Sequence, residues 1–231
     1  MKTLGLIGGV GPESTIEYYR LLIDGYRERV GDGSYPHFHL SSIDLKRMVD
    51  FFSAGKLQEV AEYLLAELQA LSRAGADFAA VAANTPHAVF DVLRQRAPLP
   101  LVSIVEATCD AARAQGLRRV GLFGTRFTMR GRFYPDVFDA AGVELVVPAT
   151  AEQDYIHDKY MGELVVGVFS DKTRAGLLEI VQRLRRDEHI EGLILGGTEL
   201  PLILRDATEA GVPLLDTTRL HVAAILNRML D

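Results

Sequence analysis

The chain has 231 residues, 48% of them hydrophobic, which is enough to bury a sizeable core as one large domain or as two compact lobes. Its formal net charge is -6 and its basic residues are scattered, so a nucleic acid is a poor candidate partner. No apolar run approaches the roughly 20 residues of a membrane span, and residues 1–3 lead directly into a strand-like segment, so we expect a cytoplasmic protein without a membrane partner.

Short apolar runs alternate with amphipathic segments along the whole chain. The predicted strands lie at residues 3–7, 38–43, 78–82, 101–104, 120–123, 145–148, 192–195 and 213–215. The predicted helices, each with apolar residues on one face, lie at residues 13–30, 57–74, 105–114, 173–186 and 218–230. Strands and helices in alternation are typical of an α/β protein with mostly parallel sheets flanked by helices.

Two parts of the chain resemble each other at an offset of about 115 residues, a spacing that suits a duplicated domain better than a solenoid repeat. Residues 77–87 resemble residues 191–200, and residues 2–8 have a shorter counterpart at residues 119–125. The sequence therefore predicts two similar lobes, each a mostly parallel sheet flanked by helices.

The boundary between the two predicted lobes falls in a stretch without a Pro/Gly/Ser-rich linker. We assign residues 1–104 together with 213–231 to an N-terminal lobe, and residues 105–212 to a C-terminal lobe. Ligands of parallel α/β sheets bind outside the carboxyl ends of the strands, so the strand-to-helix turns are the candidate functional segments. We expect the active site in the cleft between the lobes.

The first such turn is the glycine-rich segment at residues 8–15. Its glycines allow close backbone approach, Pro12 suits a first helical position, and amides around Gly11 could hold an anion. A dinucleotide fingerprint fails because Ser14 stands where the third glycine is needed, and no Gly-Lys-Ser/Thr follows for a phosphate loop. A tight turn that binds nothing is the alternative interpretation.

The second and third turns are the duplicated pair. Asn84 and Thr85 precede Pro86 in the first lobe, and Thr198 precedes Pro201 in the second. Free amides and hydroxyls at two helix N-termini would give two anion subsites, which suits a dicarboxylate or a carboxylate that becomes enolate-like. Ordinary helix capping is the alternative for each residue alone, and their duplication favours binding.

A fourth turn, at residues 124–129, is the second lobe's counterpart of the first glycine turn. Its Thr125 could donate a hydrogen bond to a carboxylate. Arg126, next to it, could equally be a surface charge.

Five segments in this order resemble the cofactor-independent aspartate/glutamate racemases, specifically the aspartate or broad-specificity amino-acid racemase branch. They lie at residues 7–15, 84–87, 124–129, 197–202 and 215–218. The resemblance implies two lobes related by pseudo-twofold symmetry, an active site between them and a homodimer. It also implies a small amino-acid or dicarboxylate ligand, and neither pyridoxal phosphate nor a metal.

Members of that family remove the α-proton of an amino acid with one cysteine thiolate and return it from a second cysteine on the opposite face. Inversion needs both groups because the α-carbon is a very weak acid. By resemblance, the two cysteine positions are occupied here by Ala83 and Gly197, which cannot exchange a proton. The single cysteine, Cys109, lies in a helical stretch and is interpreted as a small buried apolar residue.

Two other residues are candidates for the missing acid or base. His87 lies one helical turn beyond Ala83 and could titrate near neutrality, or it could be a structural hydrogen-bond partner. Glu199 could act as a base or complete a hydrogen bond at a helix start. Residues 155–160 resemble the mobile segment that closes over the substrate in relatives, so Lys159 could pair with a distal carboxylate or be a solvated loop charge.

Three hypotheses follow. The chain is a racemase or related isomerase of this superfamily whose chemistry is altered or lost; or it binds an amino acid or dicarboxylate without turning it over; or its cysteines were deliberately replaced to trap a complex. Alanine at position 83 would be an ordinary engineered choice, and glycine at position 197 a less usual one.

Overall fold

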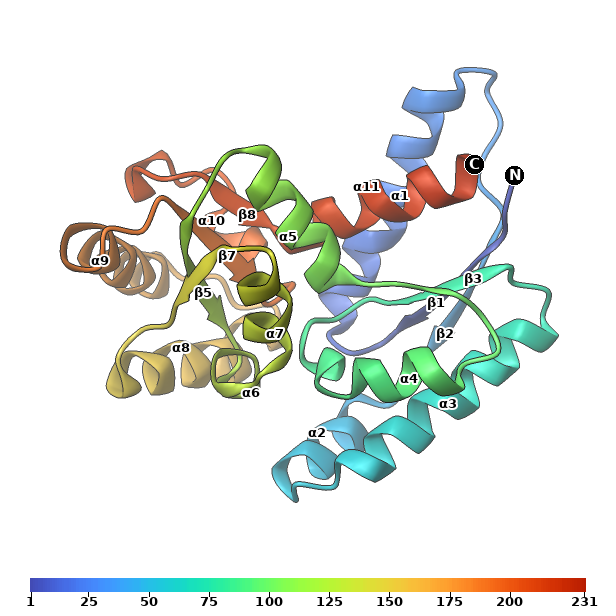
Figure 1. Ribbon diagram of the computed structural model, residues 1–231, viewed down its shortest axis with the longest axis horizontal. Helices are drawn as coiled ribbons and strands as arrows, with labels where there is room; N and C mark the ends of the chain where they lie inside the picture. The colour runs from blue at the N-terminus through green and yellow to red at the C-terminus, as the bar shows by residue number, and fades with distance from the viewer. The chain divides into compact units, whose positions relative to one another are not determined.

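The computed structural model describes residues 1–231, which form two compact units (Figure 1). Unit 1 consists of residues 1–104 and 221–231, and unit 2 of residues 105–220. We expected the whole stretch from 213 to the C-terminus to return to the first lobe. Only residues 221–231 do so, because strand β8 (Leu214–Asp216) pairs with β7 (Gly192–Gly196) and thereby belongs to the second sheet.

Unit 1 is built on a four-stranded sheet in which every neighbouring pair is parallel. Its strands in spatial order are β2 (Phe38–Ser42), β1 (Leu4–Gly8), β3 (Phe78–Val81) and β4 (Leu101–Val102). Its helices are α1 (Pro12–Val30), α2 (Leu45–Ser53), α3 (Leu57–Arg73), the 3-10 helix η1 (Thr85–Val89), α4 (Phe90–Arg96) and the part of α11 (Thr217–Leu230) that follows residue 220.

Strand β1 is buried on both of its faces, as expected for a central strand of a parallel sheet. Leu4 and Leu6 pack with apolar side chains of α1 and α11 in one hydrophobic cluster. Gly5 points toward the opposite layer, where a Cβ would lie 3.0 Å from side-chain atoms of Leu71 and Ala76. The small residue therefore lets the end of α3 approach the sheet closely.

Unit 2 repeats this topology. Its parallel sheet has the spatial order β6 (Glu144–Val146), β5 (Arg119–Gly124), β7 and β8, so its first strand is again flanked by its second and third. Its helices are α5 (Ile104–Ala114), α6 (Arg126–Arg130), α7 (Phe133–Ala140), α8 (Thr150–Gly162), η2 (Leu164–Val166), α9 (Asp171–Asp187), α10 (Leu200–Leu204) and η3 (Thr208–Ala210). The duplication in the sequence is thus a duplication of strand order.

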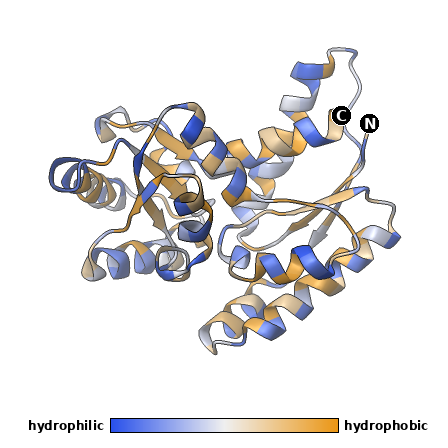
Figure 2. Ribbon diagram, in the orientation of Figure 1, coloured by the Kyte–Doolittle hydropathy of each residue, from blue (hydrophilic) through white to orange (hydrophobic).

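One apolar layer of unit 2 lies between its sheet and helices α8, α9 and α10. Phe123, Leu193 and Leu195 of the sheet join apolar side chains of these helices in one buried cluster. Figure 2 shows the same separation, with apolar strands inside and polar helix faces outside. Burying such surface removes it from water and is the main stabilising contribution of this layer.

All eight predicted strands are present, within one or two residues at most ends. Several helices were not predicted, among them α2, α7 and α8. The start of α2 has a local signal, since Asp44 accepts hydrogen bonds from the amides of Lys46 at 2.8 Å and Arg47 at 3.4 Å.

None of the helices combines the length and the apolar character that a bilayer crossing demands.

Candidate functional site

Within each unit, the structure brings the two chemistry-bearing turns to the same edge of the sheet. In unit 1, β1 and β3 are neighbours with Ile7 opposite Val81, so the glycine turn and the Asn84 turn follow adjacent strand ends. In unit 2, Gly124 lies opposite Gly196, so the Thr125 and Thr198 turns are adjacent in the same way. Both pairs occupy carboxyl ends of parallel strands, where ligands of α/β sheets bind.

The first glycine turn is braced by the helix that follows it. Thr15 accepts a hydrogen bond from the Gly9 amide at 2.9 Å, and its hydroxyl donates to the Gly11 carbonyl at 3.0 Å. Ser14 donates to the same carbonyl at 2.8 Å. Gly9 and Gly11 both have a left-handed backbone, with φ of 82° and 97°, which favours glycine. The turn is therefore preorganised, and Gly11 starts α1 without a side-chain cap.

The Asn84 turn leads into a short 3-10 helix that begins with a proline. Asn84 is buried and stands at the start of η1, yet its side chain makes no capping hydrogen bond there. Thr85 is half-buried beside it. Capping therefore does not explain Asn84. The helix η1 has only five residues, so a helix dipole contributes less at this turn than the sequence suggested.

The Thr125 hydroxyl, in contrast, acts as a helix cap. It accepts a hydrogen bond from the Thr128 amide at 3.2 Å and contacts the Thr128 hydroxyl at 3.1 Å, at the start of α6. Arg126 is not simply a surface charge, because its guanidinium donates to Asp154 at 2.9 Å. This turn is thus fastened to α8.

His87 is a satisfied structural histidine. It is 3% exposed, and its Nε2 accepts the Ile104 amide at 3.3 Å, so Nδ1 carries the proton and donates to the Ala83 carbonyl at 3.1 Å. Burial, with a smaller contribution from His221, lowers its pKa to about 3. The ring also stacks on Phe90, with 4.5 Å between centroids. A neutral ring with both nitrogens occupied is not a poised base.

Glu199 lies at the centre of a buried polar cluster in unit 2. It is 1% exposed, and its Oε2 accepts hydrogen bonds from the Tyr160 hydroxyl and, at 3.0 Å, from the Thr198 hydroxyl. Its side chain does not cap α10, which begins at Leu200 and has five residues. Burial, and then the Glu199 carboxylate, raise the pKa of Tyr160 well above its ordinary value. Tyr160 therefore stays protonated and donates to Glu199.

A model of the Asp/Glu/Hydantoin racemase family matches residues 7–225. The chain belongs to this family. A crystal structure of a candidate Asp/Glu racemase from Yersinia pestis matches it with a TM-score of 0.91 at 32% identity, over 100% of both chains. An aspartate racemase homologue from Pyrococcus horikoshii matches with a TM-score of 0.84 at 34% identity, also over 100% of both chains. The broad-specificity amino-acid racemase of Bacillus subtilis is 23% identical over 222 residues, which are 93% of this chain and 92% of that protein.

In this member of the racemase family, the two turns that follow β3 and β7 carry Ala83 and Gly197. Ala83 is buried, and its carbonyl holds His87. The sole cysteine, Cys109, lies in the middle of α5, is buried and has its sulfur 4.0 Å from the Val137 carbonyl of α7. Burial raises the pKa of the Cys109 thiol, so the reactive thiolate is disfavoured. Cys109 fits the predicted role of a packed apolar residue.

Lys159 does not lie in a loop. Residues 155–160 form part of helix α8, and Lys159 donates to Glu163 one turn further along, at 2.5 Å. Its ammonium is also 6.0 Å from the Tyr155 ring centroid. The stretch that resembles the mobile segment of relatives is part of a helix here, and ion pairs hold this helix, including that between Arg183 and Glu152. A role for Lys159 in carboxylate binding stays a prediction.

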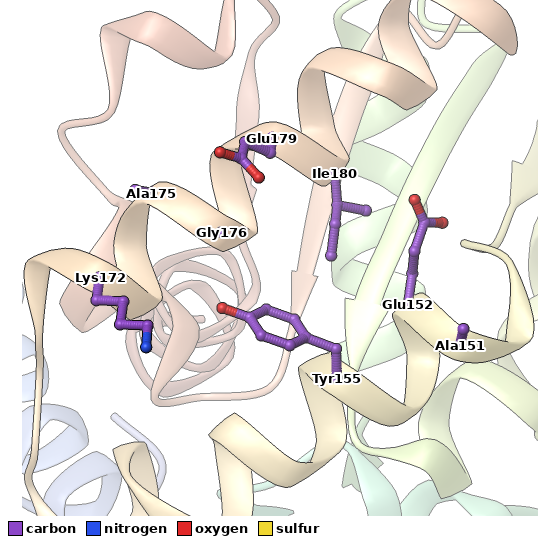
Figure 3. A pocket seen from close by; sticks show the side chains of 8 residues that line it. All are labelled: Ala151, Glu152, Tyr155, Lys172, Ala175, Gly176, Glu179 and Ile180. Atoms are coloured by element: carbon purple, nitrogen blue, oxygen red, sulfur yellow. The ribbon is translucent and has the colours of Figure 1, made fainter.

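An open groove of about 510 Å³ lies between α8 and α9 (Figure 3). It is lined by Ala151, Glu152, Tyr155, Lys172, Ala175, Gly176, Glu179 and Ile180. All of these residues belong to the two helices, and none belongs to a strand-to-helix turn. Glu152 is already engaged by Arg183, and the Tyr155 ring lies against Gly176. None of the predicted site residues lines the groove.

No group of three or more His, Cys, Asp or Glu side chains is arranged to hold a metal ion.

The polar residues that sequence reasoning overlooked are Tyr160 and His221. Tyr160 lies within a segment that resemblance had marked, but its partner Glu199 is 39 residues away. His221 contacts Tyr18 across 203 residues, at 2.8 Å. Periodicity in the sequence carries no signal for such pairs.

Proposed function

We propose that this member of the racemase family binds a small amino acid or dicarboxylate at its strand-to-helix turns, without a cofactor and without thiol chemistry. The observation that carries the proposal is the pair of equivalent turns after β3 and β7, which keep Asn84, Thr85 and Thr198 while offering Ala83 and Gly197 where resemblance places thiols. We further propose, from the family resemblance, a cytoplasmic homodimer.

The candidate proton-transfer groups at the turns of the two units, His87 and Glu199, differ in their ability to exchange a proton. Inversion at an α-carbon needs an acid and a base on opposite faces of the substrate. Among the unit 1 candidates, His87 has both nitrogens occupied and a pKa lowered to about 3. Unit 2 offers a carboxyl group in Glu199, next to the Tyr160 hydroxyl. Ligand binding is therefore better supported than racemisation, and any proton transfer is expected from the Glu199 side alone.

The second candidate function is an amino-acid racemase or isomerase with an altered acid/base pair. The buried carboxyl of Glu199 favours it, since buried carboxyls with specific partners are recurrent catalytic groups. This function additionally requires a proton donor at the turns of unit 1. Exchange without inversion would be the signature of a one-sided reaction.

Titration calorimetry with both enantiomers of aspartate and glutamate, and with succinate, tests binding. Proton NMR in heavy water tests loss of the α-proton, and chiral chromatography tests inversion. We expect measurable binding and no inversion. Racemisation by the unaltered chain would overturn the proposal that it only binds its ligand, in favour of the second candidate function. Absence of binding to every probe would overturn both candidate functions.

A matched pair of variants localises the ligand. Thr198→Val removes one hydroxyl with little change of shape. The Thr198 hydroxyl donates to Glu199, so its oxygen can still accept from the ammonium group of an amino acid, and we expect the loss of that hydrogen bond to weaken amino-acid binding about 10-fold. Thr150→Val makes the same change at the exposed first residue of α8 and should leave affinity unchanged. Equal affinities for the two variants would exclude Thr198 from the site.

A further inference from the structure

Gly197 lies directly under the ring of Tyr160. A Cβ on residue 197 would lie 2.9 Å from Cζ and 3.1 Å from the hydroxyl oxygen of Tyr160, and closer still to Cε2. Real Cβ atoms essentially never approach another heavy atom to less than 3.0 Å. Gly197 is also absent from the glycines with positive φ, so its backbone conformation is open to other residues. Space, and not backbone conformation, requires glycine here.

The neighbouring glycines of this sheet edge are constrained differently. A Cβ on Gly196 would meet the carbonyl oxygen of Phe123 at 2.7 Å, and one on Gly124 would meet the carbonyl oxygen of Gly196 at 2.7 Å. Those contacts are with the paired strands themselves and no side-chain replacement can relieve them. At Gly197 the three nearest atoms all belong to one side chain, that of Tyr160.

Tyr160 is not free to swing away. Its side chain is buried in the hydrophobic cluster of unit 2, and its hydroxyl donates to Glu199 Oε2. Helix α8, which carries it, is held by Gln153, whose amide donates to the Pro148 carbonyl at 2.7 Å, and by the Arg126–Asp154 pair. A second tyrosine of the same helix, Tyr155, lies over a glycine of α9 in the same manner. Moving the Tyr160 ring would break a hydrogen bond and disturb packing.

We infer that Tyr160 is a positioning residue of the unit 2 turn: its ring occupies the side-chain space of residue 197, and its hydroxyl orients the Glu199 carboxylate. The turn therefore offers a Tyr160–Glu199 pair as its polar group in place of any side chain on residue 197. The steric part depends on this geometry alone. The orienting part rests on the proposed function, because it assumes that a ligand binds at this turn.

A double-mutant cycle tests the steric part by thermal unfolding. Gly197→Ala should lower Tm by about 3–10 °C, because overpacking a well-packed site is destabilising. With Tyr160→Ala present, the same substitution should lower Tm by less than about 2 °C or raise it. Gly162→Ala is the matched control on α8, since a Cβ there meets nothing within 4 Å. Equal losses at position 197 in both backgrounds would overturn the inference.

Tyr160→Leu replaces Tyr160→Ala if the larger truncation does not fold, because it also removes the ring atoms nearest to residue 197. Tyr160→Phe serves as the opposite control. It keeps the ring and removes only the hydroxyl, so Gly197→Ala should remain as damaging as in the unaltered chain. A clear rescue by Tyr160→Phe would contradict the assignment of the clash to the ring.

The orienting role has its own measurement, the affinity of the amino-acid or dicarboxylate probe identified by calorimetry. Tyr160→Phe should weaken binding about 5- to 20-fold while the fold persists, and Glu199→Gln should do the same. The two losses should not add, since the residues act as one unit. Affinity unchanged in Tyr160→Phe would overturn the orienting role. If no probe binds the unaltered chain, the proposed function and the orienting role both fail, and the Tm cycle still decides the steric part.

Discussion

Two buried histidines in unit 1 make its stability depend on pH in a calculable way. His87 and His221 are both buried with both ring nitrogens hydrogen-bonded, the latter to Tyr18 at 2.8 Å and to the Val102 carbonyl at 3.1 Å. Since Nε2 of His221 faces a carbonyl, it carries the proton, and Nδ1 accepts from the Tyr18 hydroxyl. Neither ring can take up a second proton without losing a contact.

Burial lowers the pKa of His87 to about 3 and that of His221 to about 4, from 6.5. The unfolded chain therefore binds protons below pH 6.5 that the folded chain does not. Stability contributed by the neutral rings is complete above pH 6.5 and falls as the pH drops toward the folded pKa values. Each group contributes a slope of up to about 1.4 kcal/mol per pH unit. Between pH 8 and pH 5, the expected loss is about 2 kcal/mol per histidine and about 4 kcal/mol together.

His221→Gln isolates half of this effect. Glutamine keeps a donor and an acceptor but does not titrate, so the loss of unfolding free energy between pH 8 and pH 5 should shrink from about 4 to about 2 kcal/mol. Urea unfolding at pH 8, 7, 6 and 5 measures it. An undiminished acid loss in His221→Gln would refute the assignment.

Two further substitutions test the packing of the turns. Gly9→Ala should lower the free energy of unfolding in urea by more than about 2 kcal/mol, because φ of Gly9 is 82° and a Cβ there would lie 2.6 Å from a backbone nitrogen. Gly33→Ala is the control, at φ 83° with nothing within 4 Å of a Cβ, and should lower it by only about 1 kcal/mol through backbone strain. Similar losses in the two variants would exclude a clash at Gly9. Asp216→Ala should lower the free energy of unfolding by about 1–3 kcal/mol in thermal unfolding, because its carboxylate accepts from Arg205 at 2.9 Å in a largely buried pair. Glu62→Ala, which breaks an exposed pair, should lower it by less than about 1 kcal/mol. The reverse order would show that burial does not determine how much these ion pairs contribute to stability.

Most strands were predictable because a short apolar run bounded by turn residues marks them, which is a local signal. Helix α8 was not, since its sequence shows no clear apolar stripe. It is held by contacts with distant residues, such as Arg183 to Glu152 across 31 positions and Arg126 to Asp154 across 28. Such a helix is specified by tertiary partners, which periodicity cannot reveal.

The strand-to-helix turns were predictable as places, because glycine, proline and hydroxyl residues mark them locally. Their hydrogen bonding was not. Capping was the alternative interpretation for Asn84, and Thr125 was expected to donate to a carboxylate, but in the structure Thr125 caps its helix and Asn84 does not. Whether a polar residue caps a helix depends on the backbone conformation of the residues that follow it. The residues after Asn84 form the 3-10 helix η1.

Ala83 and Gly197 look alike in the sequence, as two residues without a thiol, but the structure separates them. Residue 83 already carries a Cβ, so Ala83→Cys adds only one sulfur atom, whereas Gly197→Cys places both a Cβ and a sulfur against the Tyr160 ring. We therefore expect Gly197→Cys to lower Tm by at least about 3 °C more than Ala83→Cys. The double-cysteine variant should not racemise aspartate or glutamate by chiral chromatography unless Tyr160→Ala is added. Racemisation by the double-cysteine variant with Tyr160 intact would show that the ring moves aside, and that thiols at residues 83 and 197 are sufficient for the reaction.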